Sequence, residues 1–459
     1  MRAHVRIVDK EEMAQSLASY LADLADRVSL ERLPDEVVHE GRRMLVDTLA
    51  CILAGCSEPP VQELARVMSE SSASSSSAIL GTDVRAEPRW AALAMGTAAV
   101  WHDFDSGNRF LGGHPAPHVI PAALAVGEAA ESAGRRLLEA TIAGYEIAGR
   151  VGRATRLREG MHPHGSWPVV GAAAAAAMMA GQDRNATQEA IAMSSSLTLA
   201  TSFQAAFEGA TVRNLYAGHG AAVGVLASEL ASCGFSGERM SIENIFGTIV
   251  GVEFDAAAAS APDSQWEIMR AYYKPHACAR YLHPALEALM LACPAGTVQV
   301  DDIREITVRT FDFAASMNEI HPANPLAAKF SLPHALAAYL VLGSTGIDAF
   351  SSAAIADSAI RKLAERVSVT ADAAMSRQVP MARPAAVRVL VDGRPPLEAA
   401  VQLSKSDHDA QPLTDEQLSE KFVDAATRVV SHGAAARLLE LLWKIESVPT
   451  VGDLGAALR

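Results

Sequence analysis

Three short clusters of polar side chains interrupt a chain that is otherwise strongly apolar. The first covers residues 102–106 (HDFDS) and continues with Gly-Gly-His-Pro at 112–115. The second is Met-His-Pro-His-Gly at 161–165, and the third covers residues 273–284 (YKPHACARYLHP). Histidines and carboxylates can transfer protons, while lysine and arginine can hold an anion and stabilise developing negative charge. The clusters therefore predict proton-transfer chemistry on an anionic molecule.

Sequence motifs for other chemistries are absent. There is no phosphate-binding G-x-x-x-x-G-K-[ST] loop, no H-E-x-x-H and no G-x-S-x-G. The histidines lack zinc spacing, and no aspartate-rich loop fits calcium. Gly218-His219-Gly220 with Gly224 loosely resembles a dinucleotide fingerprint, but no strand precedes it, so we interpret it as a structural glycine cluster. The sequence thus predicts no metal and no organic cofactor.

The composition limits the class of protein. Half of the 459 residues are hydrophobic and 20% are charged, which excludes a disordered chain. The 39 basic and 53 acidic residues give a net charge of −14, which argues against a nucleic-acid binder. No apolar run reaches the roughly 18 residues that span a bilayer, and residues 1–9 lack a secretory apolar core. We expect a cytoplasmic protein without a nucleic-acid or membrane partner.

The five cysteines are few and contain no C-x-x-C pair. A disulfide framework or a thiolate zinc site is therefore disfavoured. We predict that most of them are buried thiols, as in a reducing compartment.

Alanine-rich stretches with few β-branched residues dominate the first 290 residues. Residues 122–133, 137–151, 171–180 and 221–231 are apolar on every side, which predicts buried rather than surface helices. Small side chains allow such helices to pack closely. The serine-rich stretch 69–77 predicts a surface loop.

The sequence pattern changes near residue 297. Residues 297–313 are rich in β-branched residues and partly alternate, which predicts a strand. Residues 386–391 and 397–403 flank Asp392-Gly393, the turn chemistry of a β-hairpin.

Helical patterns return between and after these strands. Residues 332–342 and 349–367 predict helices, and so does the tail from 414 to 442. Thr414 and Gln417 have the spacing of a capping box at the start of that tail.

These patterns predict a mainly α fold in two parts. We expect an all-helical main domain over residues 1–272, completed by C-terminal helices over 408–459. A smaller α+β lid domain over residues 273–407 is expected to interrupt it. At this length, two domains are more probable than one core.

Several motifs make the sequence resemble the MmgE/PrpD family. They run in family order over nearly the whole chain, and their joint specificity is high. They comprise DFD…GHP…VIPAALA at 103–125, MHPHG…GAAAAAA at 161–177, LYAGHGAA at 215–222, KPHACARYLHP at 274–284, KFSLP at 329–333 and EKF at 420–422.

The resemblance implies an all-helical main domain, an α+β lid and a homodimer. Known activities of the family include 2-methylcitrate dehydration, cis-aconitate decarboxylation and iminodisuccinate epimerisation. All act on small polycarboxylates without an added cofactor. Each requires proton transfer near a carboxylate and cations that hold the anion.

Site residues follow from the matched motif positions. Asp103 matches the first acid of the family's D-F-D-D pattern, and His114 the histidine of its G-H-P segment. His162 matches the histidine before the small-residue helix, and Lys274 the lysine of the K-P-x-x-C block. The resemblance implies that these four are catalytic, although Asp103 could equally orient a histidine or cap a helix.

Two arginines are expected to bind substrate carboxylates. Arg213 stands where the family usually has a lysine, and Arg280 is the weaker candidate. The alternative for Arg213 is a structural ion pair with a nearby acid such as Glu208. Other polar residues of the clusters are expected to be structural or packing residues: Asp105, His118, His164, His276 and the thiol of Cys278.

The sequence departs from the family pattern at several positions. Ser106 replaces the second aspartate of D-F-D-D, and Gly107 stands where members often have a hydroxyl residue. Tyr216 and Val100 replace frequent histidines. Together with Arg213, these departures leave room for a substrate other than 2-methylcitrate or cis-aconitate.

The function expected is a cofactor-independent lyase or isomerase acting on a small di- or tricarboxylate. A dehydratase of the 2-methylcitrate type is the first choice, followed by a decarboxylase and then an epimerase. The rival is a non-catalytic binding or assembly protein that retains the fold. Convergence of His114, His162 and Lys274 on one pocket between the helical domain and the lid would favour the enzyme.

Overall fold

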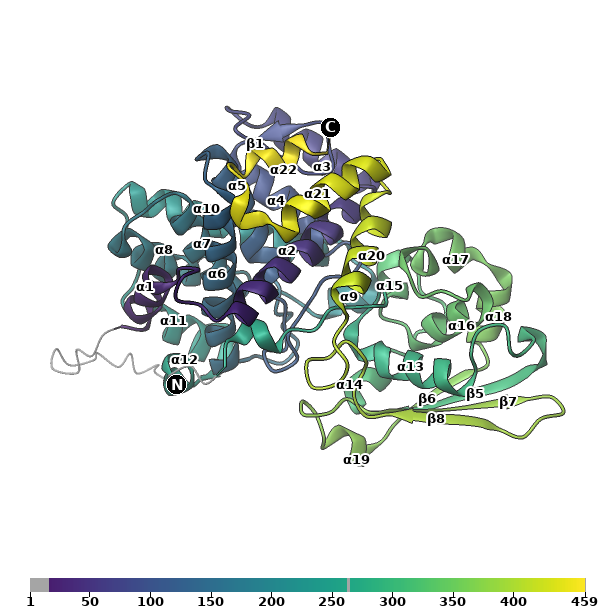
Figure 1. Ribbon diagram of the computed structural model, residues 1–459. Coiled ribbons are helices and arrows are strands. Elements are labelled where there is room, and N and C mark those ends of the chain that lie inside the picture. Colours follow the sequence, from purple (N-terminus) through teal and green to yellow (C-terminus); the bar gives the residue numbers. More distant parts are fainter. Residues whose placement is uncertain (1–15, 262–264, 459) are drawn as a thin grey trace.

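The computed structural model describes residues 16–261 and 265–458, and the N-terminal residues used to predict the compartment lie outside this range. The described residues form two main hydrophobic cores (Figure 1). The helical core is built from residues between 17 and 273 and again between 418 and 454. The α+β core is built from residues 277–391 and from Ala206. The division at 272/273 and 407/408 stays a prediction, which these cores support.

The helical core is organised around α7, whose residues are all buried. Helices α6 and α10 pack against it at very short range because small residues line the contacts. A Cβ atom at Gly171 of α7 would lie 2.1 Å from the carbonyl oxygen of Gly144 in α6. The expectation of buried, alanine-rich helices is confirmed. The helices of this part are α1 Leu17–Arg27, α2 Asp35–Gly55, α3 Pro59–Glu70, α4 Pro88–Ala99, α5 Ala116–Ala129, α6 Gly134–Ala154, α7 Pro168–Met179, α8 Arg184–Ser196, α9 Gln204–Glu208, α10 Val212–Ser232, α11 Ser241–Asn244 and α12 Ala256–Ser260.

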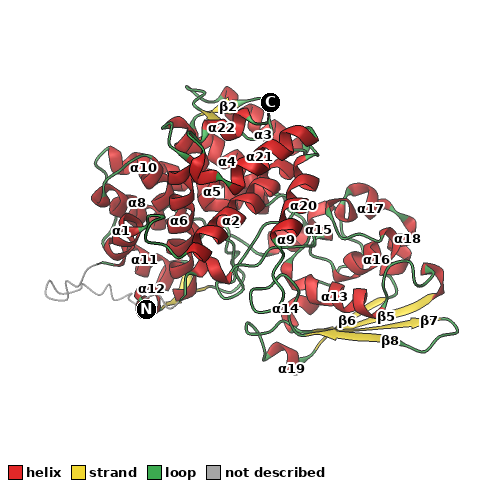
Figure 2. Cartoon of the chain, viewed as in Figure 1, coloured by secondary structure: helices red, strands yellow, loops and turns green. Residues whose placement is uncertain are grey.

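The helical part is not purely helical, which corrects the sequence-based expectation (Figure 2). Strands β1 (Ser77–Ala78) and β2 (Arg85–Ala86) pair with each other, as do β3 (Thr155–Leu157) and β4 (Gly251–Phe254). These very short strand pairs provide hydrogen-bond partners for backbone groups outside the helices. The residue pattern does not reveal where such partners are needed.

The α+β core contains a four-stranded sheet of order β6-β5-β7-β8. Strands β5 (Ile303–Thr310) and β6 (Val367–Ala371) are parallel, whereas β7 (Ala385–Val391) is antiparallel to both β5 and β8 (Leu397–Val401). Buried and more exposed residues alternate along β5 and β7, and α13 covers one face of the sheet. The predicted hairpin at Asp392-Gly393 is confirmed.

Strand β6 was not expected from the sequence. The helix predicted over 349–367 is instead α17 (Ser352–Ala356) followed by α18 (Ser358–Ala364), because Asp357 caps a new helix there. The chain then turns into the strand, which pairs with β5 across 61 residues of sequence. The other helices of this part are α13 His283–Ala292, α14 Asp312–Ala315, α15 Pro325–Ala328, α16 Leu332–Leu342 and α19 Ala373–Ser376.

The C-terminal helices α20 (Asp415–Ala426), α21 (His432–Trp443) and α22 (Gly452–Ala456) return to the helical core, as the yellow segments of Figure 1 show. The capping box is present: Gln417 N–H donates to Thr414 Oγ1 at 3.2 Å, and Thr414 N–H donates to Gln417 Oε1 at 2.9 Å. Within the described residues, no single helix is long and apolar enough to cross a membrane; α2 and α3 would qualify only as a pair bent by 94°.

Candidate active site

All six predicted site residues line one small cavity between the two cores. Asp103, His114, His162 and Arg213 come from the helical part of the chain, while Lys274 and Arg280 come from the segment that leads into the α+β core. The cavity volume is about 30 Å³, which is room for a few water molecules at most. Entry of a di- or tricarboxylate therefore requires the walls to separate. The other lining residues are Asn108, Gly112, Pro163, Phe203, Tyr272, Ala279, Tyr281, Phe330 and Arg383.

The loop between α4 and α5 carries the first cluster into the cavity. Asp103 has a positive φ of 50°, a conformation that aspartate tolerates better than most residues. The ammonium group of Lys421, in α20, holds this loop: it donates to Asp47 Oδ1 and to the Phe104 carbonyl, each at 2.7 Å, and to the Lys274 carbonyl at 3.1 Å. Lys421 thus fixes the backbone of two clusters, a role that the sequence indicated only through the matched EKF motif.

Asp103 is the centre of a buried ion cluster. Its Oδ1 accepts a hydrogen bond from Arg213 Nη2 at 2.5 Å, and its Oδ2 lies 3.2 Å from Lys274 Nζ. Burial alone would raise the pKa of the Asp103 carboxyl, but Lys274 and Arg213 outweigh it and hold the pKa below its usual value. Asp103 is therefore ionised at neutral pH and orients both cations.

Lys274 lies between two carboxylates. Besides its contacts with the Asp103 side chain, its ammonium group donates to the Asp103 carbonyl at 2.7 Å and lies 3.8 Å from Asp105 Oδ1. The side chain is almost completely buried. Lys274 thus presents a fixed positive charge at the cavity, as its predicted role requires.

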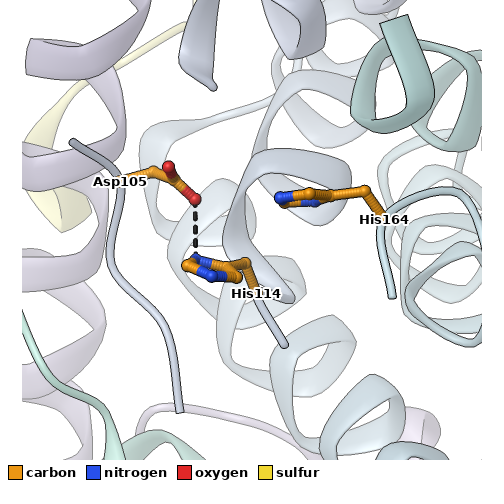
Figure 3. A group of neighbouring side chains, drawn as sticks. All are labelled: Asp105, His114 and His164. Atoms are coloured by element: carbon orange, nitrogen blue, oxygen red, sulfur yellow. Dashed lines mark ion pairs between the residues drawn. The ribbon is translucent and has the colours of Figure 1, made fainter. Parts of the chain in front are cut away.

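His114 forms a carboxylate–imidazole pair with Asp105 (Figure 3). His114 Nδ1 lies 2.8 Å from Asp105 Oδ2 and 2.7 Å from the Ser106 carbonyl oxygen. Two acceptors at one nitrogen place the proton on Nδ1 and leave Nε2 free for proton transfer. Burial raises the pKa of the Asp105 carboxyl, but His114 and Lys274 more than offset it, so the pKa is lowered. The sequence predicts a structural role for Asp105, and its contact with His114 makes it a residue that orients this histidine.

His162 lies deeper than His114. Its Nδ1 accepts a hydrogen bond from the backbone N–H of His164 at 3.1 Å, and its Nε2 lies 3.4 Å from Arg213 Nε. Burial, and then the positive charge of Arg213, hold the pKa of His162 well below its usual range. His162 is therefore neutral at physiological pH and acts as a hydrogen-bonding group rather than as a stored proton.

Three other histidines of the clusters are packed in the interior, as expected, and are not solvated. His118 donates from Nδ1 to the His114 carbonyl at 3.1 Å and accepts at Nε2 from Gly165 N–H at 3.0 Å. The His164 ring stacks between His114, His118 and His162, with centroids 4.8–5.3 Å apart. Burial lowers the pKa of His118 and of His276 to about 3.

We expect the buried neutral histidines to make the protein acid-labile. Above their ordinary pKa of about 6.5 they are neutral in both states, but below it only the unfolded chain takes up the protons. Stability is therefore fully present above about pH 6.5 and is lost as the pH falls, by about 1.4 kcal/mol per pH unit for each histidine. The residues with pKa values lowered mainly by burial are His102, His118, His162, His164, His219, His276, His283 and His334.

Urea unfolding at pH 7.5, 6.5 and 5.5 measures this dependence. In His118→Gln the free energy of unfolding should change less steeply with pH below pH 6.5, by about 1.4 kcal/mol per pH unit, because one titrating group is removed. A free energy of unfolding that does not change between pH 7.5 and 5.5 would show that these rings titrate normally in the folded protein.

Arg213 does not pair with Glu208. Its guanidinium group donates to Asp103, to the Val100 carbonyl at 3.1 Å and to Asn214 Oδ1 at 3.3 Å, and its Cζ lies 5.5 Å from the centre of the Phe330 ring. Most of its N–H groups are thus engaged by the protein. Arg213 orients Asp103, and its predicted binding of a substrate carboxylate stays a prediction.

We expect Arg213→Lys to lower kcat/KM by about 100-fold on the native substrate. Lysine keeps the charge but cannot reach Asp103 and the Val100 carbonyl together, so Asp103 and Lys274 shift. A misplacement of about 1 Å costs on the order of 100-fold in rate. Steady-state kinetics of the variant measure the effect, and near-normal turnover would make Arg213 a residue whose charge alone matters.

Arg280 is also engaged by the protein. It donates to Ser406 Oγ and to His283 Nδ1, each at 3.0 Å, and one of its amino groups lies 3.4 Å from Asp407 Oδ2. Burial lowers the pKa of Arg280. Arg280 fixes the loop after β8 against the cavity, and its expected role in substrate binding stays a prediction.

The departures from the family pattern have structural partners. A Cβ atom at residue 107 would lie 2.5 Å from the Tyr272 hydroxyl oxygen, so glycine is required while Tyr272 occupies this place. Ser106 Oγ donates to Met44 Sδ at 3.0 Å. The hydrogen bonds of Ser106 to Asp47 and of Val100 to Arg213 involve only the backbone of Ser106 and Val100, so they do not depend on these side chains. The Tyr216 ring lies 6.0 Å from His162.

Among the residues that the structure describes, two groups of side chains have donor atoms close enough to hold a metal ion. One group is Asp105, His114 and His164, drawn in Figure 3, and the other is His276, His283 and Glu287. The expectation that no metal is needed stays a prediction. The thiols agree with the sequence: all five cysteines are free, only Cys233 is exposed, and burial raises the pKa of Cys278.

The charge of the cavity lining is opposite to that of the whole protein. Four cations line it, namely Arg213, Lys274, Arg280 and Arg383, against the single carboxylate of Asp103. Arg383 belongs to no motif, and no pattern in the sequence indicates a role for it. On a chain with net charge −14, such a local excess of positive charge favours an anionic ligand.

Comparisons with known proteins agree with the resemblance. The MmgE/PrpD N-terminal domain model matches residues 19–257, and the MmgE/PrpD C-terminal domain model matches residues 276–447. Cis-aconitate decarboxylase of Homo sapiens is 24% identical, with 97% of this chain and 95% of that protein covered. A cis-aconitate decarboxylase-like protein of Aspergillus oryzae is also 24% identical, over 92% of this chain and 93% of that protein. The chain belongs to the MmgE/PrpD family.

Proposed function

We propose that the protein is a cofactor-independent lyase that decarboxylates a small unsaturated tricarboxylate of the cis-aconitate type. The observation that carries the proposal is the convergence of the Asp105–His114 pair with four buried cations on one small cavity. The relatives are named for cis-aconitate decarboxylation, which supports this reaction over 2-methylcitrate dehydration, the first choice from the sequence.

The reaction needs one bond broken and one proton delivered. The bond between a methylene carbon and its carboxylate breaks, CO₂ leaves, and the electron pair forms a new double bond to the central carbon. The electrons of the original double bond bind a proton at its other carbon, the one that is not the central carbon. We assign that proton to His114, because Asp105 and the Ser106 carbonyl oxygen hold its Nδ1 and leave Nε2 as the free ring nitrogen.

The cations have a different task in this scheme. Negative charge spreads over the remaining carboxylates as the carbon–carbon bond breaks. A buried ammonium group such as that of Lys274, held in place by Asp103, stabilises this charge without having to reorganise. His162, neutral and beside Arg213, would hydrogen-bond the same carboxylates.

Dehydration and epimerisation also pass through a stabilised carbanion, so the three reactions must be distinguished by their products. We would treat the protein with a chelator, incubate it separately with cis-aconitate, 2-methylcitrate and iminodisuccinate, and follow each reaction by NMR. The expected result is loss of CO₂ from cis-aconitate with unchanged rate after chelation. Turnover of 2-methylcitrate alone would establish the dehydratase, and activity abolished by chelation would contradict the cofactor-free mechanism.

Site residues that point apart would favour a non-catalytic role. His114, His162 and Lys274 instead line the same cavity, which is the arrangement expected of an enzyme. Absence of turnover on all three compounds would favour the non-catalytic role.

A further inference from the structure

We propose that Arg383 is the anchor for one carboxylate of the substrate on the α+β wall of the cavity. The proposal rests on the function proposed above and deepens it, because it assigns a specific contact to a residue outside every family motif in the chain. The ligand class is a small carboxylate anion with at least two acid groups.

Arg383 is a buried cation without an acidic partner. Its side chain lines the cavity and the residue is only 7% exposed. Its Nε is buried without a hydrogen-bond acceptor, and among the described residues no carboxylate forms an ion pair with it. A guanidinium group buried in this way is unfavourable unless a ligand supplies the missing anion.

The other arginines at this cavity are different. Arg213 is paired with Asp103, and Arg280 lies 3.4 Å from Asp407. Arg109, beside the same loop, is paired with both Asp407 and Asp409. Each of these neighbouring guanidinium groups therefore has an acidic partner within the protein, whereas the guanidinium group of Arg383 can bind the carboxylate of a ligand.

The backbone around Arg383 is held rigidly, as an anchor requires. Arg383 N–H donates to the Gln402 carbonyl at 3.1 Å, and the Pro384 carbonyl accepts from Thr310 Oγ1 at 2.9 Å. The Arg383 guanidinium lies 4.8 Å from the centre of the Tyr281 ring, which fixes its plane. Its position just before β7 is thus set by the sheet.

Arg383 and the proton-transfer pair come from different parts of the chain that meet at the cavity. Asp105 and His114 belong to the loop before α5, while Arg383 belongs to the α+β part. A substrate bound by both parts would join them and exclude water during the reaction. The planar guanidinium fork can hold one carboxylate through two parallel hydrogen bonds, which also sets the orientation of the molecule.

The test compares Arg383→Met and Arg383→Lys with the wild-type protein. The matched control is Arg388→Met, because Arg388 lies on the same strand β7 but is exposed and paired with Glu398 at 3.0 Å. The probe is tricarballylate, a saturated tricarboxylate that cannot react in the proposed way, and binding is measured by calorimetry. kcat/KM is then measured on cis-aconitate.

We expect Arg383→Met to weaken tricarballylate binding by about 10- to 150-fold, the value of a hydrogen bond to a charged group. The affinity of Arg383→Lys for tricarballylate should lie between those of Arg383→Met and the wild type. The affinity of Arg388→Met should equal that of the wild type. Without ligand, Arg383→Met should unfold at a higher temperature, because it removes an unpaired buried charge. A structural arginine would show the opposite change in unfolding temperature.

Unchanged tricarballylate affinity in Arg383→Met would overturn the proposal, and so would a lower unfolding temperature of the ligand-free variant. No binding of tricarballylate to the wild type would overturn it as well. If the wild type binds the probe through Arg383 but does not turn over cis-aconitate, the proposed decarboxylation fails while the carboxylate anchor stands.

Discussion

Lys274→Met will lower kcat/KM by about 100- to 1,000-fold, the range measured when one preorganised charge-stabilising group is removed. Methionine has a similar length but no charge, so the developing negative charge of the substrate loses its nearest fixed cation. Lys274 Nζ touches both the side chain and the carbonyl of Asp103, so the loss also frees the loop that carries His114. Steady-state kinetics on the substrate identified by NMR measure the effect.

The same change will also lower the free energy of unfolding. Removal of a lysine with a purely catalytic role would leave this free energy unchanged. Asp103 would keep Arg213, but Asp105 would lose its lysine neighbour and retain the contact with His114. Breaking a buried ion pair in this way costs about 3–5 kcal/mol. Lys362→Met in α18, whose lysine lies on the surface, provides the control for both measurements. A folded Lys274→Met variant with wild-type kinetics would refute the assignment.

His114→Ala will lower kcat by about 100- to 10,000-fold, the range attributed to general acid catalysis. His114 is the histidine of the cavity that pairs with a carboxylate, and its side chain is 14% exposed, so the loss of packing is modest. Added imidazole should restore part of the activity, because it can enter the space left by the ring and carry the proton.

The control for this prediction is His321→Ala, which removes an exposed histidine paired with Glu365. It should leave kcat unchanged. If His114→Ala kept wild-type activity, or if imidazole had no effect on an inactive and folded variant, the proton donor would have to be another group.

The local features of the fold could be predicted because they depend on neighbouring residues. The β-hairpin at Asp392-Gly393 and the capping box at Thr414 are encoded within a few positions. Strand β6 depends on parallel pairing with β5, about 60 residues away, and was missed. Short-range patterns do not specify such distant pairing.

The candidate site shows the same limit. Motif matching identified Asp103 and Arg213, but not that the two pair across 110 residues of sequence. It also gave Asp105 a packing role, since the contact with His114 appears only after the loop folds. Arg383 belongs to no motif, and it is identified only because it is buried with no acidic partner among the described residues.

The most direct test of the account is the conversion of cis-aconitate by chelator-treated protein in D₂O. We predict one CO₂ released for each substrate consumed and one deuterium on carbon in each product, because the proton on His114 exchanges with solvent before it is transferred. Lys274→Met should show almost no conversion under the same conditions. Addition of water without CO₂ release, or no conversion of cis-aconitate by the wild type, would contradict the proposed decarboxylation.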